Sequence, residues 1–180
     1  MFDRFGNEQG LAMLIAHLPA GYIFGSFARS RWPGKGIMPA AMLGSVFPDI
    51  DMLYFHFVDG GRTHHHAYIT HWPLFWAATG LVALSVAKWC GQRYLAPVSA
   101  FFAAAMMHMI LDSVASPMMW LMPFDGHALE LVTVPAMYRN WVMSFILHWT
   151  FALELLICAW ALALGFRRSQ LVAATPKNST

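Results

Sequence analysis

The chain of 180 residues has the length of one domain, and 58% of its residues are hydrophobic while only 11% are charged. Soluble domains carry about 25% charged residues, so this composition indicates a membrane protein and argues against a soluble globular fold. The formal net charge of +2 comes from scattered Lys and Arg residues, without the basic stripe of a nucleic-acid-binding protein. Cys90 and Cys158 lie in or beside apolar runs without CxxC spacing, which predicts neither a disulfide framework nor a zinc ribbon.

Five apolar segments approach the length of about 20 residues that a membrane-spanning helix needs. We expect an all-α fold, a polytopic integral membrane helix bundle with about four to five transmembrane helices. Residues 1–166 are expected to form one membrane-embedded domain, and residues 167–180 a disordered polar cytoplasmic tail. The proline-containing segment 117–140 predicts a loop at the membrane surface. The predicted spans are residues 11–28, 37–58, 72–90, 95–116 and 141–166.

Basic residues are unevenly divided between the two sides of this predicted topology. By the positive-inside rule the richer side faces the cytoplasm, which places the C-terminus inside. We therefore expect a multi-pass protein of a bacterial-type inner (plasma) membrane. The richer side carries Arg29, Arg31, Lys35, Lys88, Arg93, Arg167, Arg168 and Lys177, and the other side carries Arg4, Arg62 and Arg139.

Ionisable residues concentrate in the stretch 47–71 and recur in the predicted spans. Such residues are costly near hydrocarbon, so their presence indicates a functional site. In the predicted topology they all fall near the outer end of the bundle, which favours one shared site. They include Asp49, Asp51, His56, His64, His65, His66 and His71 in the stretch, with His17, His108 and Asp112 in the spans.

Two pairs in this set have spacings that suit metal binding. His108 and Asp112 are four residues apart on a predicted helix and share one face, so a nitrogen and an oxygen can reach one ion. A buried His–Asp hydrogen bond is the alternative. Asp49 and Asp51 reach one site only if the backbone turns near Pro48, and a divalent cation would compensate their repulsion. Acids at a helix end in water are the alternative for this pair.

The remaining polar residues have less specific surroundings. His66 and His71 are further imidazole ligands, and Thr70 is placed to orient one of them. His17 is an isolated histidine on an apolar helix, a setting in which a hydrogen-bonded packing role is common. His148 lies near enough to the outer face to join the site, whereas an interhelical hydrogen bond is expected for Glu154. The roles of His64 and His65 stay open.

The order and spacing of these residues resemble the YdjM-like family of membrane-bound proteins, described as metal-dependent hydrolases of a LexA-regulated type. The resemblance covers about residues 11–124 and extends distantly to zinc-dependent phospholipase C, whose His and Asp ligands hold metal for phosphoester cleavage. The chain departs from the family at one motif. Where the family has His-Arg-Gly-x-Thr-His, this chain has neither the Arg nor the Gly, and Arg62 is the nearest basic residue. It rests on His17, on Pro48-Asp49-Ile50-Asp51, on His66-Ala67-Tyr68-Ile69-Thr70-His71, and on His108 and Asp112 followed by Ser116-Pro117.

These observations predict a membrane-bound, metal-dependent hydrolase that acts on a lipid or lipid-linked phosphoester at the outer face. Zinc is the favoured divalent metal and manganese is the alternative. Asp51 either ligates the metal or serves as the general base. A metal-ion or proton transporter is disfavoured by the few polar residues in the predicted inner halves, and a non-catalytic protein with a structural metal site stays open. The expected partners are the bilayer and a lipid substrate, with no nucleic acid. The expected ligands are His17, Asp49, Asp51, His66, His71, His108 and Asp112.

Overall fold

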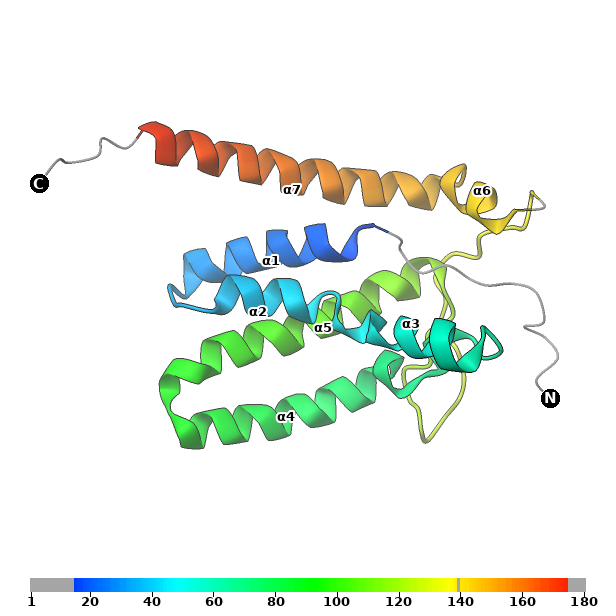
Figure 1. The fold of residues 1–180 in the computed structure, drawn as a ribbon, viewed down its shortest axis with the longest axis horizontal. Helices are drawn as coiled ribbons and strands as arrows, with labels where there is room; N and C mark the ends of the chain where they lie inside the picture. The colour runs from blue at the N-terminus through cyan, green and yellow to red at the C-terminus, as the bar shows by residue number, and fades with distance from the viewer. Residues whose placement is uncertain (1–14, 139, 175–180) are drawn as a thin grey trace, which may run out of the picture.

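The computed structural model describes residues 15–138 and 140–174, and the fold in these residues is helical (Figure 1). An isolated bridge between Met118 and Leu129 is the only β pairing among the described residues, so the all-α prediction is confirmed. The α-helices are α1 (His17–Arg31), α2 (Ile37–Gly44), α3 (Asp51–Tyr54), α4 (Pro73–Cys90), α5 (Leu95–Ala115), α6 (Trp141–Ile146) and α7 (Trp149–Ala174). The short turns are 3-10 helices η1 (Phe47–Ile50), η3 (His65–Ala67), η4 (Ile69–His71) and η5 (Gln92–Tyr94), with one π-helix, η2 (Phe55–Asp59).

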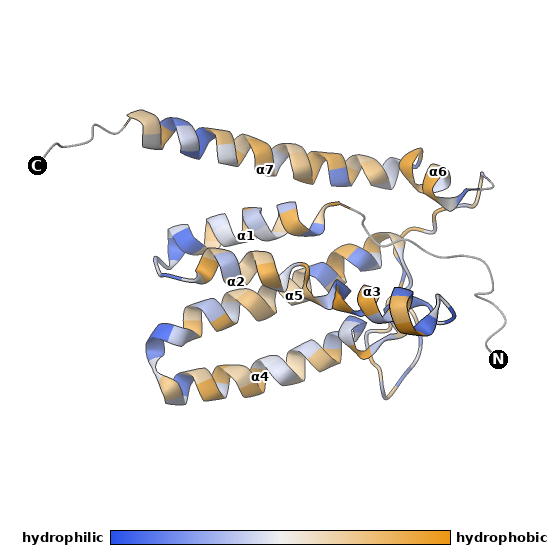
Figure 2. Ribbon diagram, viewed as in Figure 1, coloured by the Kyte–Doolittle hydropathy of each residue, from blue (hydrophilic) through white to orange (hydrophobic). Residues whose placement is uncertain are grey.

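Three described helical segments are long and apolar enough to cross a membrane, Pro73–Cys90, Gln92–Ala115 and Trp149–Leu171. They correspond to the last three predicted spans. The second predicted span, residues 37–58, is not one continuous helix, because α2 ends at Gly44 and shorter helices follow it. Hydrophobic residues predominate along the long helices, and hydrophilic residues gather at the turns (Figure 2).

The helix α2 is held between α1 on one side and α5 on the other, and α5 also packs against α4 (Figure 1). Glycines allow this close approach, as is common where membrane helices pack. A Cβ atom at Gly44 would lie 2.1 Å from the carbonyl oxygen of Phe101 on α5. A Cβ atom at Gly21 on α1 would lie 2.1 Å from Oγ of Ser45. The backbone that follows α2 is thereby fixed against both neighbouring helices.

Small residues fill the interior along these contacts. One cluster of buried residues joins α1, α2 and α5 and contains Ala28, Ile37, Ala41, Ala100 and Ala104. A second cluster joins α4, α5 and the segment after α5, and contains Trp76, Ala105, Met109 and Met118. Because the side chains at the first cluster are short, the helix backbones lie close together and carry their polar residues into one volume.

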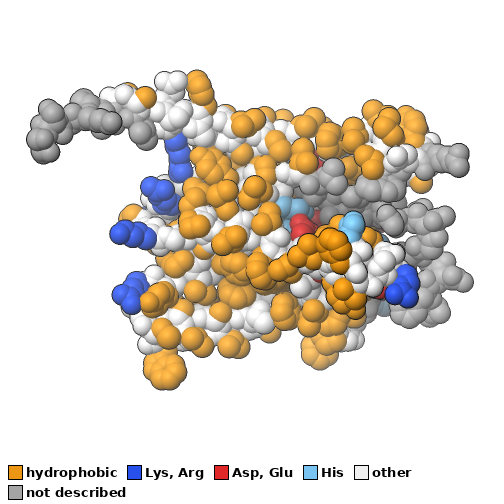
Figure 3. All heavy atoms as spheres, viewed as in Figure 1, with side chains coloured by type: hydrophobic (Ala, Val, Ile, Leu, Met, Phe, Trp, Pro, Cys, Tyr) orange, Lys and Arg blue, Asp and Glu red, His pale blue; other side chains and the backbone are white. Residues whose placement is uncertain are grey.

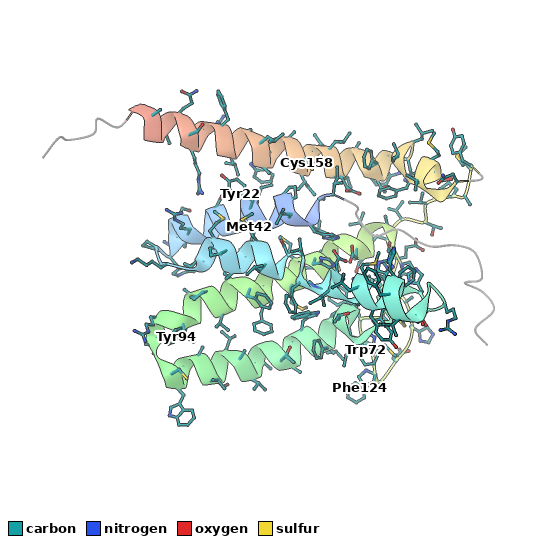
Figure 4. The ribbon with its side chains drawn as sticks, in the orientation of Figure 1. Tyr22, Met42, Trp72, Tyr94, Phe124 and Cys158 are labelled. Carbon is teal, nitrogen blue, oxygen red and sulfur yellow. The ribbon has the colours of Figure 1, made fainter. Side chains whose placement is uncertain are left out.

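The last helix, α7, lies along α1, and Tyr22 of α1 and Cys158 of α7 lie in the space between the two (Figure 4). Oε2 of Glu154 accepts a hydrogen bond from the backbone N–H of Ile15 at 2.6 Å, and Nη2 of Arg168 donates to the carbonyl of Ser26 at 3.1 Å. The helix extends to Ala174, so helix rather than the predicted disordered tail occupies residues 167–174. The last six residues of that predicted tail, 175–180, lie outside the described residues.

The predicted loop of residues 117–140 has no α-helix in its described part. Backbone hydrogen bonds tie it to the end of α5, because the N–H of Leu131 donates to Ser113 and that of Val132 donates to Val114. The loop therefore lies against the end of the bundle where the polar residues also gather.

Candidate metal centre

The backbone turns sharply after α2, and this turn places the first two acids. Gly44 ends α2, and Pro48 stands at the start of η1, where its missing N–H costs no hydrogen bond. Asp49 lies in the 3-10 turn and Asp51 begins α3, so the backbone between the two acids is not one regular α-helix. Both then approach His71, at 3.5 Å from Asp49 Oδ1 to Nε2 and 2.6 Å from Asp51 Oδ2 to Nδ1.

The helix α5 contributes the predicted pair at i and i+4. Nε2 of His108 lies 3.0 Å from Oδ2 of Asp112, so the prediction of a shared face is confirmed. His17, from the first turn of α1, lies 3.0 Å from Oδ1 of Asp112 through its Nε2. The rings of His17 and His108 stack with centroids 3.8 Å apart. Asp112 therefore presents one oxygen to each of two parallel imidazoles.

Two short turns before α4 supply the remaining imidazoles. Nε2 of His66, from η3, lies 3.8 Å from Oδ2 of Asp112, and Nε2 of His71, from η4, lies 3.9 Å from the same oxygen. Asp49 Oδ1 lies 3.5 Å from Nε2 of both His71 and His108. The two carboxylates thus stand between histidines that come from four separate segments of the chain.

Many polar atoms in this cluster are buried without a hydrogen bond. His66, His71, His108 and Asp112 are 0% exposed, and His17 is 5% exposed. Each buried polar group without a hydrogen bond costs about 1–3 kcal/mol of folding free energy. The donor set of imidazole nitrogens and carboxylate oxygens is that of a transition-metal or zinc ion, so the residues fit such a group. The atoms without a hydrogen bond include both nitrogens of His17 and His66, Nε2 of His71 and His108, and both oxygens of Asp112.

The donor atoms divide into groups of three that could each hold one ion. Each group contributes one atom per residue, and these atoms lie within 4.8 Å of one another. A further group of this kind, His64 with His65 and His66, shares His66 with the cluster. The two groups inside the cluster are His17, Asp49 and His108, and His66, His71 and Asp112. Six of the seven predicted ligands are therefore members of these groups, and Asp51 is not.

Hydrogen bonds to the other ring nitrogens orient two of the histidines. Nδ1 of His108 donates to the carbonyl of Ser45 at 2.8 Å, which leaves Nε2 as the lone-pair atom of the neutral ring. Ser45 follows the last residue of α2, where the carbonyls lack a helical partner. Nδ1 of His71 donates to Asp51, which also accepts a hydrogen bond from Oγ1 of Thr70. Nε1 of Trp76 donates to the carbonyl of Thr70 at 2.7 Å and fixes this turn.

The histidines outside the spanning helices differ in their affinity for protons. Burial alone would lower the pKa of His71, but its hydrogen bonds to Asp49 and Asp51 raise the pKa to about 9. Burial lowers the pKa of His66 well below its usual range, although the charge of Asp112 opposes this. In the metal-free protein His71 is therefore the cationic partner of the acids, while His66 is a neutral ring with an available lone pair.

The structure leaves other candidate residues outside the cluster. Nδ1 of His148 lies 2.9 Å from Oγ1 of Thr150, and His148 belongs to none of the three groups. Nε of Arg62 donates to the carbonyl of Asp59 within its own exposed turn. His56 and His127 are exposed and contact Met52 and Asp125, respectively.

Two residues that support the cluster were not assigned from the sequence. The carbonyl of Ser45 carries no side-chain signal, and only the adjacent Gly44 indicated an irregular backbone there. No role was predicted for Trp76, although the carbonyl of Thr70 that its ring N–H reaches lies only six residues earlier. The partner of the Ser45 carbonyl, His108, lies across the bundle.

Comparison with known proteins gives one family. A family model described as YdjM inner membrane protein matches residues 13–174. No curated protein and no solved structure matches the chain. The match spans all the described helices, including the five segments that contribute ligands to the cluster.

Proposed function

The chain belongs to the YdjM inner membrane protein family, and from its buried histidine–aspartate cluster we propose that it is a membrane-bound, metal-dependent hydrolase of phosphoesters. The observation that carries this proposal is the convergence of four buried imidazoles on the buried carboxylate of Asp112 and on Asp49, with several of the buried nitrogen and oxygen atoms left without a hydrogen bond. The phosphoester class, the preference for zinc over manganese and the LexA-regulated type stay predictions from the resemblance.

The arrangement suits two ions better than one. His17 and His108 with Asp49 form one set of three ligands, and His66 and His71 with Asp112 form the other. Three protein ligands and an open position are usual at catalytic zinc, and paired ions are common in enzymes that cleave phosphoesters. Such ions supply Lewis-acid activation of water and of the scissile phosphoryl group.

The residues around the ligands fix the geometry. The carbonyl of Ser45 holds the ring of His108, and Asp51 holds the ring of His71. Because Oδ2 of Asp51 accepts from both His71 and Thr70, and the side chain is only 5% exposed, we assign Asp51 to orienting His71. This positioning role replaces the general-base role expected from the sequence.

We place the cluster at the outer end of the membrane body. The basic side chains gather at the opposite end, over the α1–α2 and α4–α5 turns and the end of α7 (Figure 3). By the positive-inside rule that end is cytoplasmic, which also places the C-terminus inside. A reporter fused after Thr180 should then be active only as a cytoplasmic reporter, and an external reporter would overturn this orientation.

A transport function has less support. Transport across the membrane requires polar groups on both halves of the bundle. Among the described residues, Glu154 is the one fully buried ionisable side chain outside the cluster and Asp51, and it accepts a hydrogen bond from Ile15. The buried ionisable groups therefore define a site at one end and not a path.

Elemental analysis of detergent-purified protein tests the proposal. We expect about two zinc or manganese ions per chain in the wild type and their loss in the double variant Asp49→Ala/His108→Ala. The matched control is His127→Ala, because His127 is exposed and outside the cluster. Retention of metal by the double variant, or no metal in reconstituted wild type, would overturn the proposal. Metal-dependent hydrolysis of bis(p-nitrophenyl) phosphate tests the catalytic part.

A further inference from the structure

The cluster opens to the outside at one of its members. Among the six residues of the two ligand groups, the histidines and Asp112 are buried, whereas the side chain of Asp49 is 33% exposed. Asp49 is therefore the most accessible of these six ligands from the surface of the described part of the protein. This opening lies on η1, directly after the end of α2.

The rim of the opening is apolar. Phe47 and Ile50, which flank Asp49 on η1, are 43% and 47% exposed. Leu53 and Tyr54 of α3 follow, at 60% and 52% exposed. Figure 3 shows acidic and histidine side chains at the surface between hydrophobic side chains in this region. Contiguous exposed apolar side chains beside a polar site are typical of a membrane contact or a ligand-binding surface.

The chain segment that contains this opening is acidic. The segment 37–61 contains no Lys or Arg, and its acids are Asp49, Asp51 and Asp59. Within this segment no Lys or Arg is present to bind an anionic headgroup, so metal cations in the cluster would supply the attraction. A polar soluble substrate gains nothing from the apolar rim, whereas an acyl or prenyl chain gains contact area along it.

We propose that the substrate is an amphiphile that enters from the hydrocarbon side of the bundle, with its phosphoester headgroup at Asp49 and its apolar chain against Phe47, Ile50 and Leu53. This inference rests on the proposed hydrolase function and adds the route and the residues that select the substrate. The rim residues ligate nothing, so their effect is on recognition of the chain. The headgroup of the substrate reaches the ions, while the chain stays in lipid.

Paired variants test the route. In Ile50→Ser/Leu53→Ser we expect kcat/KM for a long-chain phospholipid in mixed micelles to fall about tenfold, the range that lost apolar contacts give. Bound metal and the rate on bis(p-nitrophenyl) phosphate should stay at wild-type values. The matched control is Leu155→Ser/Leu156→Ser on α7, which removes exposed apolar side chains far along another helix and should change neither rate.

A second measurement does not depend on turnover. A phospholipid with a photoreactive diazirine in its acyl chain should label residues 47–54 saturably in the wild type, and label α7 only in proportion to lipid concentration. The inference would be overturned if Ile50→Ser/Leu53→Ser lost activity equally on the phospholipid and on bis(p-nitrophenyl) phosphate, or if its rate on the phospholipid were unchanged. Non-saturable labelling of residues 47–54 would also overturn it. The proposed function fails separately, by absence of metal or of hydrolysis of the soluble ester.

Discussion

Asp112 and Glu154 are both fully buried acids on long apolar helices, yet their surroundings differ. Both oxygens of Asp112 face histidine Nε2 atoms, and neither has a hydrogen bond. Glu154 Oε2 instead accepts a backbone N–H from Ile15 at 2.6 Å. A buried carboxylate that receives protein donors holds two segments together, whereas one that faces lone pairs calls for a cation.

The helices that carry these acids explain the difference. The helix α5 packs against α1, α2 and α4, so residues from several segments reach Asp112. The helix α7 packs against α1 and the adjacent α6 (Figure 1), and Glu154 accepts a hydrogen bond from the backbone just before α1. Composition alone does not separate the two helices, because both are hydrophobic enough to span a membrane. The number of packed neighbours decides which acid becomes part of a site.

The largest effect is expected when the two acids are neutralised in turn. Asp112→Asn keeps the shape of the side chain but removes the charge and one oxygen. Metal affinity should therefore fall by more than about a hundredfold, which exceeds the effect of mutating a residue that only hydrogen-bonds to a ligand. Glu154→Gln should leave bound metal unchanged, because its carboxylate accepts a hydrogen bond from Ile15 and belongs to none of the three ligand groups. Elemental analysis and competition with a zinc chelator measure both. Equal metal loss in the two variants would remove the distinction between them.

Asp51→Asn tests whether an acid next to the cluster acts through a histidine. Loss of its charge should weaken metal binding about tenfold to a hundredfold, because His71 is then less firmly held and less basic. Asp59→Asn is the control, since Asp59 is an exposed acid that bonds to Thr63. Chelator competition gives the affinities. A loss as large as that of Asp112→Asn would make Asp51 a direct ligand instead.

The sequence predicted much of this arrangement because its signals were local. The i and i+4 spacing of His108 and Asp112 defines a helix face, and Pro48 marks the turn at Asp49 and Asp51. The contacts across the bundle could not be predicted in this way. The carbonyl of Ser45 reaches His108 because Gly44 lets α2 approach α5, and nothing local in the sequence indicates that contact. The second predicted span is not one helix, because α2 ends at Gly44 and a 3-10 turn with Pro48 follows.

The pH dependence of metal binding separates the cluster from a site of neutral groups. In the metal-free protein the pKa of His71 is raised from 6.5 to about 9. A metal must displace this proton, so its affinity should rise about tenfold per pH unit between pH 6.5 and 8.5. The charged His71 stabilises the metal-free protein fully below pH 6.5, and this contribution is lost as the pH rises through about 9.

Titration calorimetry in buffers of different ionisation enthalpy counts the released proton. The melting temperature of the metal-free protein should also decline from pH 6.5 to 9, while that of the metal-loaded protein should not show this decline. In Asp51→Asn, metal affinity and the melting temperature of the metal-free protein should both change less with pH. One of the two hydrogen bonds that raise the pKa of His71 loses its charge in this variant. Metal affinity independent of pH would mean that His71 carries no proton to displace.

The smallest effect is expected one step further out, at Thr70. Its hydroxyl donates to Asp51, and Asp51 in turn holds His71, so Thr70→Val should weaken metal binding only severalfold, below the range of about tenfold to a hundredfold for a direct partner of a ligand. Thr70→Ser keeps the hydroxyl and should restore the affinity. If instead Thr70→Val, which keeps the methyl group, binds metal like the wild type and Thr70→Ser is weak, the methyl group matters and the hydrogen bond to Asp51 does not. In that case Thr70 would not act through Asp51.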